Sequence, residues 1–180
     1  GFGVNVKIGD PEGREVPRGT VGEIVVRGPN IMKGYWNKPE ESARALRDGW
    51  LWSGDGAYMD EAGYMFIVDR MKDMIVSGGE NVYSAEVENV IARHPAVAMC
   101  AVIGIPHAQW GESVHAVVVP RPGASLQEDE LRAHCHEAIA GYKCPKSVEF
   151  RDALPLSAAG KVLKVDLRAP HWAGKERRVN

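Results

Sequence analysis

A lysine near the C-terminal end of the chain stands where it can do phosphate chemistry. Residues 154–164, LPLSAAGKVLK, place Lys161 directly after a loop of small residues. A Gly-Lys pair suggests a phosphate loop, but the upstream glycine that a P-loop requires is missing. We therefore expect Lys161 to reach an anionic ligand as a single cation, outside any Walker motif.

Two further polar residues could bind a nucleotide. Asp55 stands between glycines in SGDG, where its carboxylate either caps a turn or accepts hydrogen bonds from two neighbouring sugar hydroxyls. Arg70 belongs to a charged cluster with Asp69, Lys72 and Asp73, and its guanidinium offers a fixed fork of donors to phosphate or ribose oxygens. The cluster is equally open to interpretation as a solvated boundary or as a hinge between domains.

A pair of glycines, Gly78 and Gly79, lies in VSGGENVYSAEVE between an expected strand and an expected helix. Backbone without side chains can approach a ligand closely at such a place. A tight strand-to-helix turn explains the same residues, so both interpretations stay open.

The histidines predict no metal site. His134 and His136 flank Cys135 on an expected helix, where residues two apart point in different directions. His107 and His115 have no partners at ligand or triad spacing. We expect no metal ligand from these residues.

Composition indicates a soluble globular protein of one or two domains. The 180 residues are 44% hydrophobic and 26% charged, and the formal net charge of −2 disfavours a dedicated nucleic-acid binder. No apolar run approaches the length of a membrane span, and the first residues lack the design of a signal peptide. Three cysteines without CxxC spacing predict buried or incidental thiols in a reducing cytoplasm. Because the chain lacks an initiator methionine and opens as if within a strand, we expect it to be a piece of a longer protein.

Up to about residue 70 the pattern predicts short strands separated by turns. VNVKIG and GEIVVRG are expected strands, KPEESARAL is a short helical turn, and GWLWSGDGAYMDEAGYMFIVD forms a hairpin around Gly63. This β-rich block has no complete core of its own.

From about residue 71 helices and strands alternate. Ser84 is expected to cap a helix, AVAMCAVIGI and SVHAVVV to form an antiparallel pair, and Ser125 with Glu128 to form a capping box before a second helix. SVEFR supplies a last strand. The order β-α-β-β-α-β predicts a small α+β domain, and the chain as a whole is assigned to the α+β class.

Together these segments resemble the adenylate-forming enzymes, which comprise acyl-CoA synthetases, luciferases and the adenylation domains of peptide synthetases. GEIVVRGPNIMKGYW, the long stretch from GWLWSGDG to SGGENVYSAEVE, PHAQWGE and YKCPKSVEF…LPLSAAGKVLK follow in order and at family-like spacing. The resemblance implies that residues 1–70 are the β-rich end of a large adenylation domain and residues 71–180 the C-terminal lid domain. The family's phosphate loop and acyl pocket would lie outside these residues.

The resemblance also implies roles for single residues. Asp55 is similar to the carboxylate that holds both ribose hydroxyls of ATP, and Arg70 to the arginine that contacts ribose and phosphate. Lys72 occupies the hinge position. Lys161 is similar to the adenylation lysine, whose ammonium meets the α-phosphate and the acyl carboxylate.

Rotation of the lid in this family exchanges the adenylation site for a CoA site. The resemblance implies that Gly78 and Gly79 line the pantetheine tunnel. Further residues lie where the family often binds the CoA nucleotide: Trp110, Tyr142, Lys143 and Lys146. Mg²⁺ would accompany the triphosphate without a ligand from this chain.

The expected function is that of an acyl-CoA synthetase fragment: ATP activates a carboxylic acid, with a fatty acid favoured, to acyl-AMP, and CoA takes the acyl group. Two alternatives stay open, an enzyme that loads a carrier-protein phosphopantetheine and a non-catalytic α+β binding module. Against an RNA-binding module, the central strands lack the exposed aromatic residues that it needs. We expect the fragment to be inactive alone and to self-associate.

Overall fold

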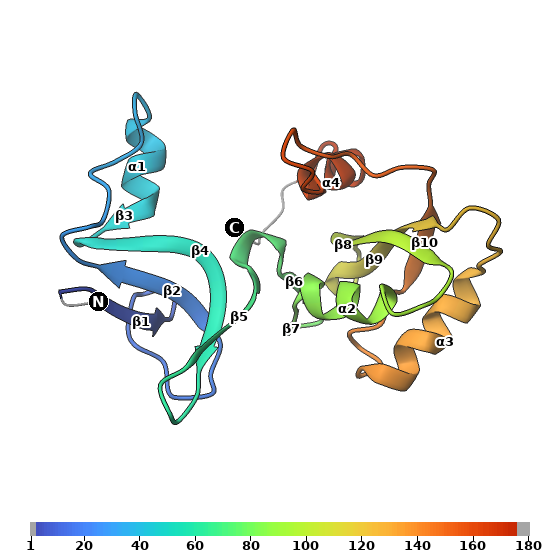
Figure 1. The fold of residues 1–180 in the computed structure, drawn as a ribbon, viewed down its shortest axis with the longest axis horizontal. Coiled ribbons are helices and arrows are strands. Elements are labelled where there is room, and N and C mark those ends of the chain that lie inside the picture. Colours follow the sequence, from blue (N-terminus) through green and yellow to red (C-terminus); the bar gives the residue numbers. More distant parts are fainter. Residues whose placement is uncertain (1–2, 176–180) are drawn as a thin grey trace. The chain divides into compact units, whose positions relative to one another are not determined.

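The computed structural model describes residues 3–175 and divides the chain into two compact units (Figure 1). Unit 1 is Gly1–Met71 and unit 2 is Lys72–Asn180. Strands and helices occur in both, so the α+β class is confirmed. None of the described helices is long and apolar enough to cross a bilayer.

Unit 1 is built on an antiparallel sheet. Its strands run in the order β1-β2-β4-β3, and β5 also pairs with β4. Its elements are β1 (Asn5–Gly9), β2 (Gly22–Arg27), α1 (Pro39–Ala45), β3 (Leu46–Arg47), β4 (Trp50–Met59) and β5 (Met65–Arg70). Its buried cluster is small and centres on Ile8, Ile24 and Ala57.

The hairpin between β4 and β5 is present as predicted. Asp60 and Tyr64 close its turn, since the Tyr64 backbone nitrogen donates to Asp60 Oδ1 at 2.8 Å and the Asp60 nitrogen donates to the Tyr64 carbonyl at 2.9 Å. Gly63 adopts φ +86°, a left-handed conformation that glycine takes without a Cβ clash. The hairpin register places Asp55 opposite Arg70.

Unit 2 contains a mixed sheet with helices on both faces. Its strands run in the order β10-β9-β6-β7, and β8 also pairs with β9. A 3-10 turn (Met71–Asp73) spans the division between the units. The strands and helices of unit 2 are β6 (Ile75–Ser77), β7 (Glu80–Val82), α2 (Ser84–Ile91), β8 (Val97–His107), β9 (Gly111–Pro120), α3 (Glu128–Ala138), β10 (Ser147–Phe150) and α4 (Lys164–Trp172). The predicted antiparallel pair is β8 with β9, whereas β10 runs parallel to β9.

Alternation along β9 separates the core of unit 2 into two clusters. Val114, Ala116 and Val118 belong to the cluster that includes residues of α2 and α3. Val117 lies on the other face, in a cluster with Leu167 of α4. Because side chains alternate along a strand, the polar residue His115 shares the α4 face with Val117.

Both expected helix caps are wrong. Helix α2 begins at Ser84 itself, after Tyr83, and the Ser84 hydroxyl is buried and accepts a hydrogen bond from Lys164 Nζ at 2.7 Å. Helix α3 begins at Glu128, which is therefore its first residue. A capping box with Ser125 would need Glu128 to be the third residue of the helix, and no side-chain cap is formed. Acidic residues in the first turn of α3 favour its start through the helix dipole instead.

The predicted order β-α-β-β-α-β omitted strand β7 (Glu80–Val82) and helix α4. Strands β6 and β7 precede α2, and α4 follows β10. The thiols are placed as expected: burial raises the pKa of Cys100 to about 12 and that of Cys135 to about 11, so both stay protonated at neutral pH.

Candidate functional site

Lys161 ends a closed loop between β10 and α4. The Ser157 nitrogen donates to the Lys161 carbonyl at 2.8 Å, the Lys161 nitrogen donates to Ser157 Oγ at 3.1 Å, and the Gly160 nitrogen donates to the Ser157 carbonyl at 2.8 Å. Leu156 and Val162 form a bridge at the base of the loop. The hydrogen bonds fix the backbone of this small-residue loop and present Lys161 at its exit.

The ammonium of Lys161 is exposed, and among the described residues no carboxylate pairs with it. Its neighbours are committed elsewhere. Lys164 Nζ lies 2.7 Å from Glu88 Oε1, and Arg168 Nη1 lies 2.7 Å from Asp73 Oδ1. Lys161 is therefore the cation of this segment that can meet an external anion without breaking an ion pair.

Asp55 and Arg70 come together in unit 1. They are register partners on β4 and β5, and Arg70 Nε lies 3.0 Å from Asp55 Oδ1. The Asp55 and Arg70 side chains are 32% and 55% exposed, which leaves both accessible to a ligand. Within β4, the residue before Asp55 is held to the neighbouring strand β2, since the Gly54 nitrogen donates to Glu23 Oε1 at 2.8 Å.

Lys72 is the first residue of unit 2 and follows the division between the units. The next residue is anchored, because Asp73 is buried and paired with Arg168. Asp73 thus has a structural role within unit 2. Although it belongs to the charged cluster predicted from the sequence, it is not exposed to solvent. The role of Lys72 as a hinge stays a prediction.

Gly78 and Gly79 form the turn of the β6–β7 hairpin, which corrects the expected strand-to-helix turn. Ser77 pairs with Glu80 across them, and their φ angles are +63° and +88°. A two-residue hairpin turn with two positive φ angles favours glycine at both positions. The space beside Gly79 is open, since a Cβ there would meet no atom within 4 Å.

Trp110 lies beside this turn. The Gly78 nitrogen donates to the Trp110 carbonyl at 3.0 Å, and a Cβ on Gly78 would lie 3.8 Å from Trp110 Cδ1. The indole stacks on His107 with ring centroids 4.4 Å apart and is 38% exposed. The structure thus brings together three of the residues expected at the CoA site.

The other residues expected to bind CoA lie between α3 and β10. Lys143 Nζ is 2.7 Å from Glu86 Oε1, and this hydrogen bond raises the pKa of Lys143. It lies 5.8 Å from the Tyr142 ring centroid, and Lys146 Nζ donates to the Gly141 carbonyl at 2.9 Å. To bind a phosphate, Lys143 would have to break its ion pair with Glu86, whereas Lys146 would give up only its hydrogen bond to the neutral Gly141 carbonyl.

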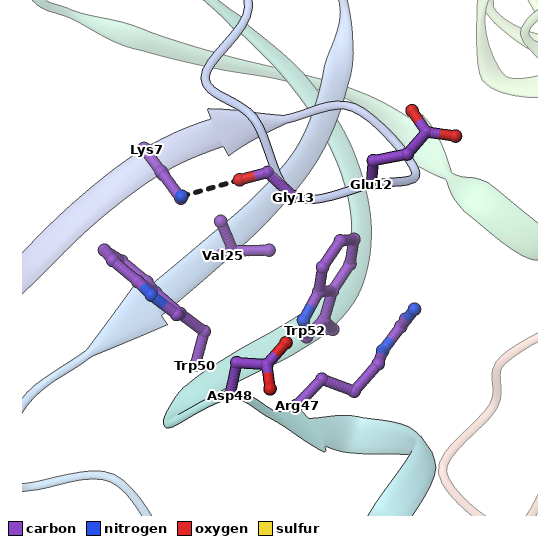
Figure 2. Close-up of a pocket in the computed structure, with 8 residues that line it drawn as sticks. All are labelled: Lys7, Glu12, Gly13, Val25, Arg47, Asp48, Trp50 and Trp52. Carbon is purple, nitrogen blue, oxygen red and sulfur yellow. Dashed lines mark hydrogen bonds between the residues drawn. The ribbon is translucent and has the colours of Figure 1, made fainter.

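A pocket of about 140 Å³ lies in unit 1, apart from all predicted site residues (Figure 2). Figure 2 shows Val25 between the two indoles, with Lys7 on the side of Trp50 and Arg47 on the side of Trp52. Lys7 Nζ lies 4.4 Å from the Trp50 ring centroid, and the Arg47 guanidinium carbon lies 3.8 Å from that of Trp52. These cation–π contacts stabilise the sheet surface, so we assign the pocket no role in catalysis.

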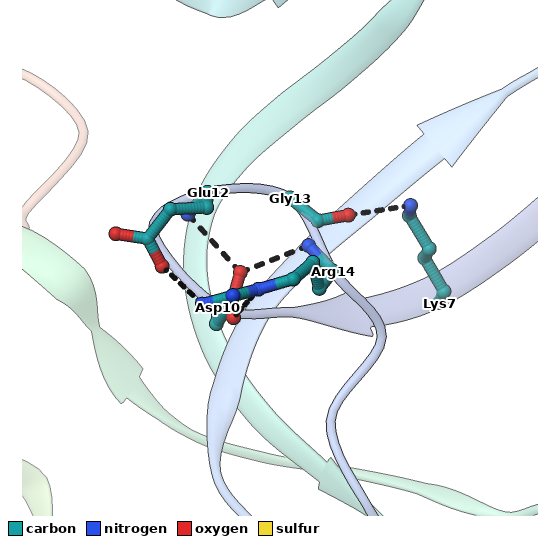
Figure 3. A network of polar contacts seen from close by, with 5 residues as sticks. All are labelled: Lys7, Asp10, Glu12, Gly13 and Arg14. Carbon is teal, nitrogen blue, oxygen red and sulfur yellow. Dashed lines mark hydrogen bonds and ion pairs between the residues drawn. The ribbon is translucent and has the colours of Figure 1, made fainter.

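The turn beside this pocket is held by its own polar network (Figure 3). Asp10 Oδ1 accepts hydrogen bonds from the backbone nitrogens of Glu12 and Arg14, and Arg14 Nε pairs with Asp10 Oδ2 at 2.8 Å. Lys7 Nζ donates to the Gly13 carbonyl at 2.6 Å. All these contacts serve the turn that follows β1.

Comparison with known proteins covers both units. The family profile of the AMP-binding enzyme matches residues 2–36, and that of the AMP-binding enzyme C-terminal domain matches residues 86–161. A feruloyl-CoA synthase from Amycolatopsis sp. is 55% identical over 93% of the chain and 34% of its own length. The fatty acid–[acyl-carrier-protein] ligase ScoC from Streptomyces coeruleorubidus is 46% identical over 99% of the chain and 34% of its own length.

Among solved structures, ATP-bound MatB from Rhodopseudomonas palustris matches with a TM-score of 0.85 and 45% identity, over 93% of this chain and 34% of MatB. The chain thus spans about a third of the length of the relatives that it matches.

Proposed function

The chain belongs to the AMP-binding, or adenylate-forming, enzymes, and on that premise we propose that the whole protein is an AMP-forming acid–CoA ligase. A substrate carboxylate attacks the α-phosphorus of ATP, pyrophosphate leaves, and an acyl-AMP forms. The CoA thiol then attacks the acyl carbon, releasing AMP and the acyl-CoA. Unit 1 would be the end of the large adenylation domain and unit 2 the lid.

The exposed ammonium of Lys161, which pairs with no carboxylate of residues 3–175, carries this proposal. Attack of a carboxylate on a phosphate brings two anions together, and negative charge builds on the phosphoryl oxygens as the new bond forms. A cation delivered at that point stabilises the transition state more than the separated reactants. Mg²⁺ on the triphosphate would share this task.

Asp55 and Arg70 would bind the nucleotide from unit 1. A carboxylate can accept hydrogen bonds from both ribose hydroxyls, and the adjacent guanidinium can donate to ribose and phosphate oxygens. Their ion pair supports this proposal because it holds an acceptor and a donor side by side. Lys72 would be the hinge about which unit 2 changes place, an assignment supported by the division at Met71.

The CoA thiol would arrive along the β6–β7 turn. The open space beside Gly79 and the half-exposed indole of Trp110 support a passage there for a slender pantetheine arm. Lys146, Lys143 and Tyr142 would meet the nucleotide end of CoA.

The acid substrate is proposed only as a class. The names of two relatives refer to a feruloyl group and to fatty acids, so both aryl and fatty acids fit the proposal. The sequence favoured a fatty acid, and the proposal now includes both aryl and fatty carboxylic acids as substrates.

Replacing Lys161 tests the central step. In the full-length protein we expect Lys161→Ala to slow acyl-AMP formation, measured as pyrophosphate release, by about 10²–10³, the usual cost of losing one electrostatic contact in the transition state. Thioester formation from supplied acyl-AMP and CoA is expected to continue. The exposed Lys175 provides the matched control, and Lys175→Ala should leave both half-reactions intact. Equal loss of the two half-reactions in Lys161→Ala would contradict the assignment.

Replacing Asp55 tests the ribose contact. Loss of hydrogen bonds to a charged group typically costs ~1.5–3 kcal/mol, so Asp55→Ala should raise KM for ATP about 10- to 100-fold. The wild type should discriminate against 2′-deoxy-ATP, and the variant should lose most of that discrimination. The Asp55–Arg70 pair is too exposed for its loss to unfold the sheet. An unchanged preference for ATP over 2′-deoxy-ATP would show that Asp55 does not contact the ribose.

A carrier protein is the second candidate acceptor, favoured by the 46% identity to ScoC over 99% of the chain. Acyl transfer with free CoA and with holo-carrier protein separates the two. We expect CoA to be the faster acceptor. Transfer to the holo-carrier alone would replace the ligase proposal by this one.

The isolated chain would self-associate through β5. Three consecutive residues of this strand, Met65, Phe66 and Ile67, are 36%, 44% and 69% exposed. An exposed apolar edge strand can pair with another chain. Sedimentation of the isolated chain over a range of concentrations should show dimers or larger species, and a monomer at all concentrations would refute this.

A further inference from the structure

Three side chains with metal-binding atoms meet in unit 2, apart from the proposed nucleotide and CoA residues. They are His115 of β9, Glu149 of β10 and His171 of α4, and one ligand atom from each lies within 4.8 Å of the other two. Sequence spacing gave His115 no partner. The fold supplies two, because β10 pairs with β9 and α4 covers the same face of the sheet.

His115 is the best-defined member of the group. It is 6% exposed, and its Nε2 atom is buried without a hydrogen-bond partner. Its Nδ1 lies 2.7 Å from Ser147 Oγ, the hydroxyl of its register partner on β10. With the proton on Nδ1 donated to that hydroxyl, Nε2 keeps its lone pair for a ligand. Glu149 Oε2, at 3.6 Å, is too distant for a hydrogen bond.

Glu149 is oriented as a ligand would be. Arg151 Nε holds Oε1 at 2.5 Å, which leaves Oε2 for the side that His115 faces.

His171 approaches from the last turn of α4. Its ring centroid lies 5.2 Å from that of His115, with the rings inclined at 57°. The adjacent Trp172 fixes this end of the helix, since its Nε1 donates to the Gly104 carbonyl at 2.9 Å. Leu167 buries the middle of α4 against the sheet. His171 itself is partly exposed, so its side chain can turn towards the other two.

We propose that His115, Glu149 and His171 bind one divalent transition-metal ion of the zinc class. Two imidazole nitrogens and one carboxylate oxygen suit Zn²⁺, whereas Mg²⁺ and Ca²⁺ prefer oxygen ligands throughout. Ligand atoms of a tetrahedral zinc site lie ~3.3 Å apart, given bonds of ~2.0–2.1 Å, so an inward rotation of His171 would bring the three protein ligands to this spacing, with water as the fourth ligand. Ser147 and Arg151 supply the outer hydrogen bonds that orient metal ligands.

The position of the site gives it a consequence for the Lys161 loop. Glu149 precedes this loop and His171 follows it, so a bound ion would tie both ends of the segment to β9. This inference does not rest on the proposed ligase activity, because the three residues and their test are independent of ATP, CoA and acid.

Zinc titration of the metal-stripped full-length protein tests the site. We expect calorimetry to show one Zn²⁺ bound per chain that is lost, or weakened by more than ~100-fold, in both His171→Gln and Glu149→Gln. His136→Gln is the matched control, since His136 is an exposed histidine of α3, and it should bind as the wild type does. Co²⁺ should give the intense visible absorption of a four-coordinate ion in wild type and control, and not in the other two variants.

Thermal unfolding provides a readout that separates metal binding from damage to the fold. Zn²⁺ should raise the Tm of the wild type and of His136→Gln, and leave that of His171→Gln unchanged. If His171→Gln does not fold, the titration of Glu149→Gln decides. The proposal is overturned if the wild type binds no Zn²⁺ at micromolar concentration, or if both site variants bind it with the same stoichiometry and affinity as the wild type.

Discussion

Two shielded ion pairs hold the segment that carries the candidate catalytic lysine. Lys164 pairs with Glu88 of α2, and Arg168 pairs with Asp73, with the four side chains only 11–22% exposed. Removal of one partner from such a pair leaves a poorly solvated charge, which is costly, so α4 is firmly fixed to unit 2. The cations of α4 are engaged in these pairs, whereas the Lys161 ammonium in the preceding loop pairs with no carboxylate in the described part of the chain.

The sequence pattern predicted those strands and turns that depend on residues close together in the chain. The β4–β5 hairpin follows from strand alternation around a turn with Gly63 at positive φ, and the β8–β9 pair from two β-branched runs. Strand β7 was missed because its three residues are too few to show alternation. Helix α4 was missed because it contains Pro170 and is stabilised by Leu167 and distant ion pairs, neither of which a local pattern reveals. Ser84 resembles a cap in sequence, but burial commits its hydroxyl to Lys164.

Some residues of the candidate site could likewise be predicted from the sequence, and others could not. The motif around Lys161 was evident in the sequence. The predicted hairpin contained Asp55 and ended just before Arg70, and the ion pair between these residues became visible only in the structure. By contrast, no spacing connects His115 with Glu149 or His171, because a parallel strand pair and a helix on the sheet bring them together. Groups of this kind come from topology, so residue-by-residue inspection of a sequence misses them.

The distribution of charge over the units constrains how such a catalyst can work. Asp55 and Arg70 belong to unit 1, whereas Lys161 belongs to unit 2, so the proposed adenylation step would draw on residues of both units. A lysine that has to enter and leave a reaction centre cannot also serve the stability of its own unit, because each departure would then cost an ion pair. Lys143, held by Glu86 at 2.7 Å, illustrates the opposite case of a cation used within the unit. The loop that ends at Lys161 resolves this conflict by taking its stability from backbone hydrogen bonds and the Ser157 hydroxyl, which leaves the ammonium uncommitted.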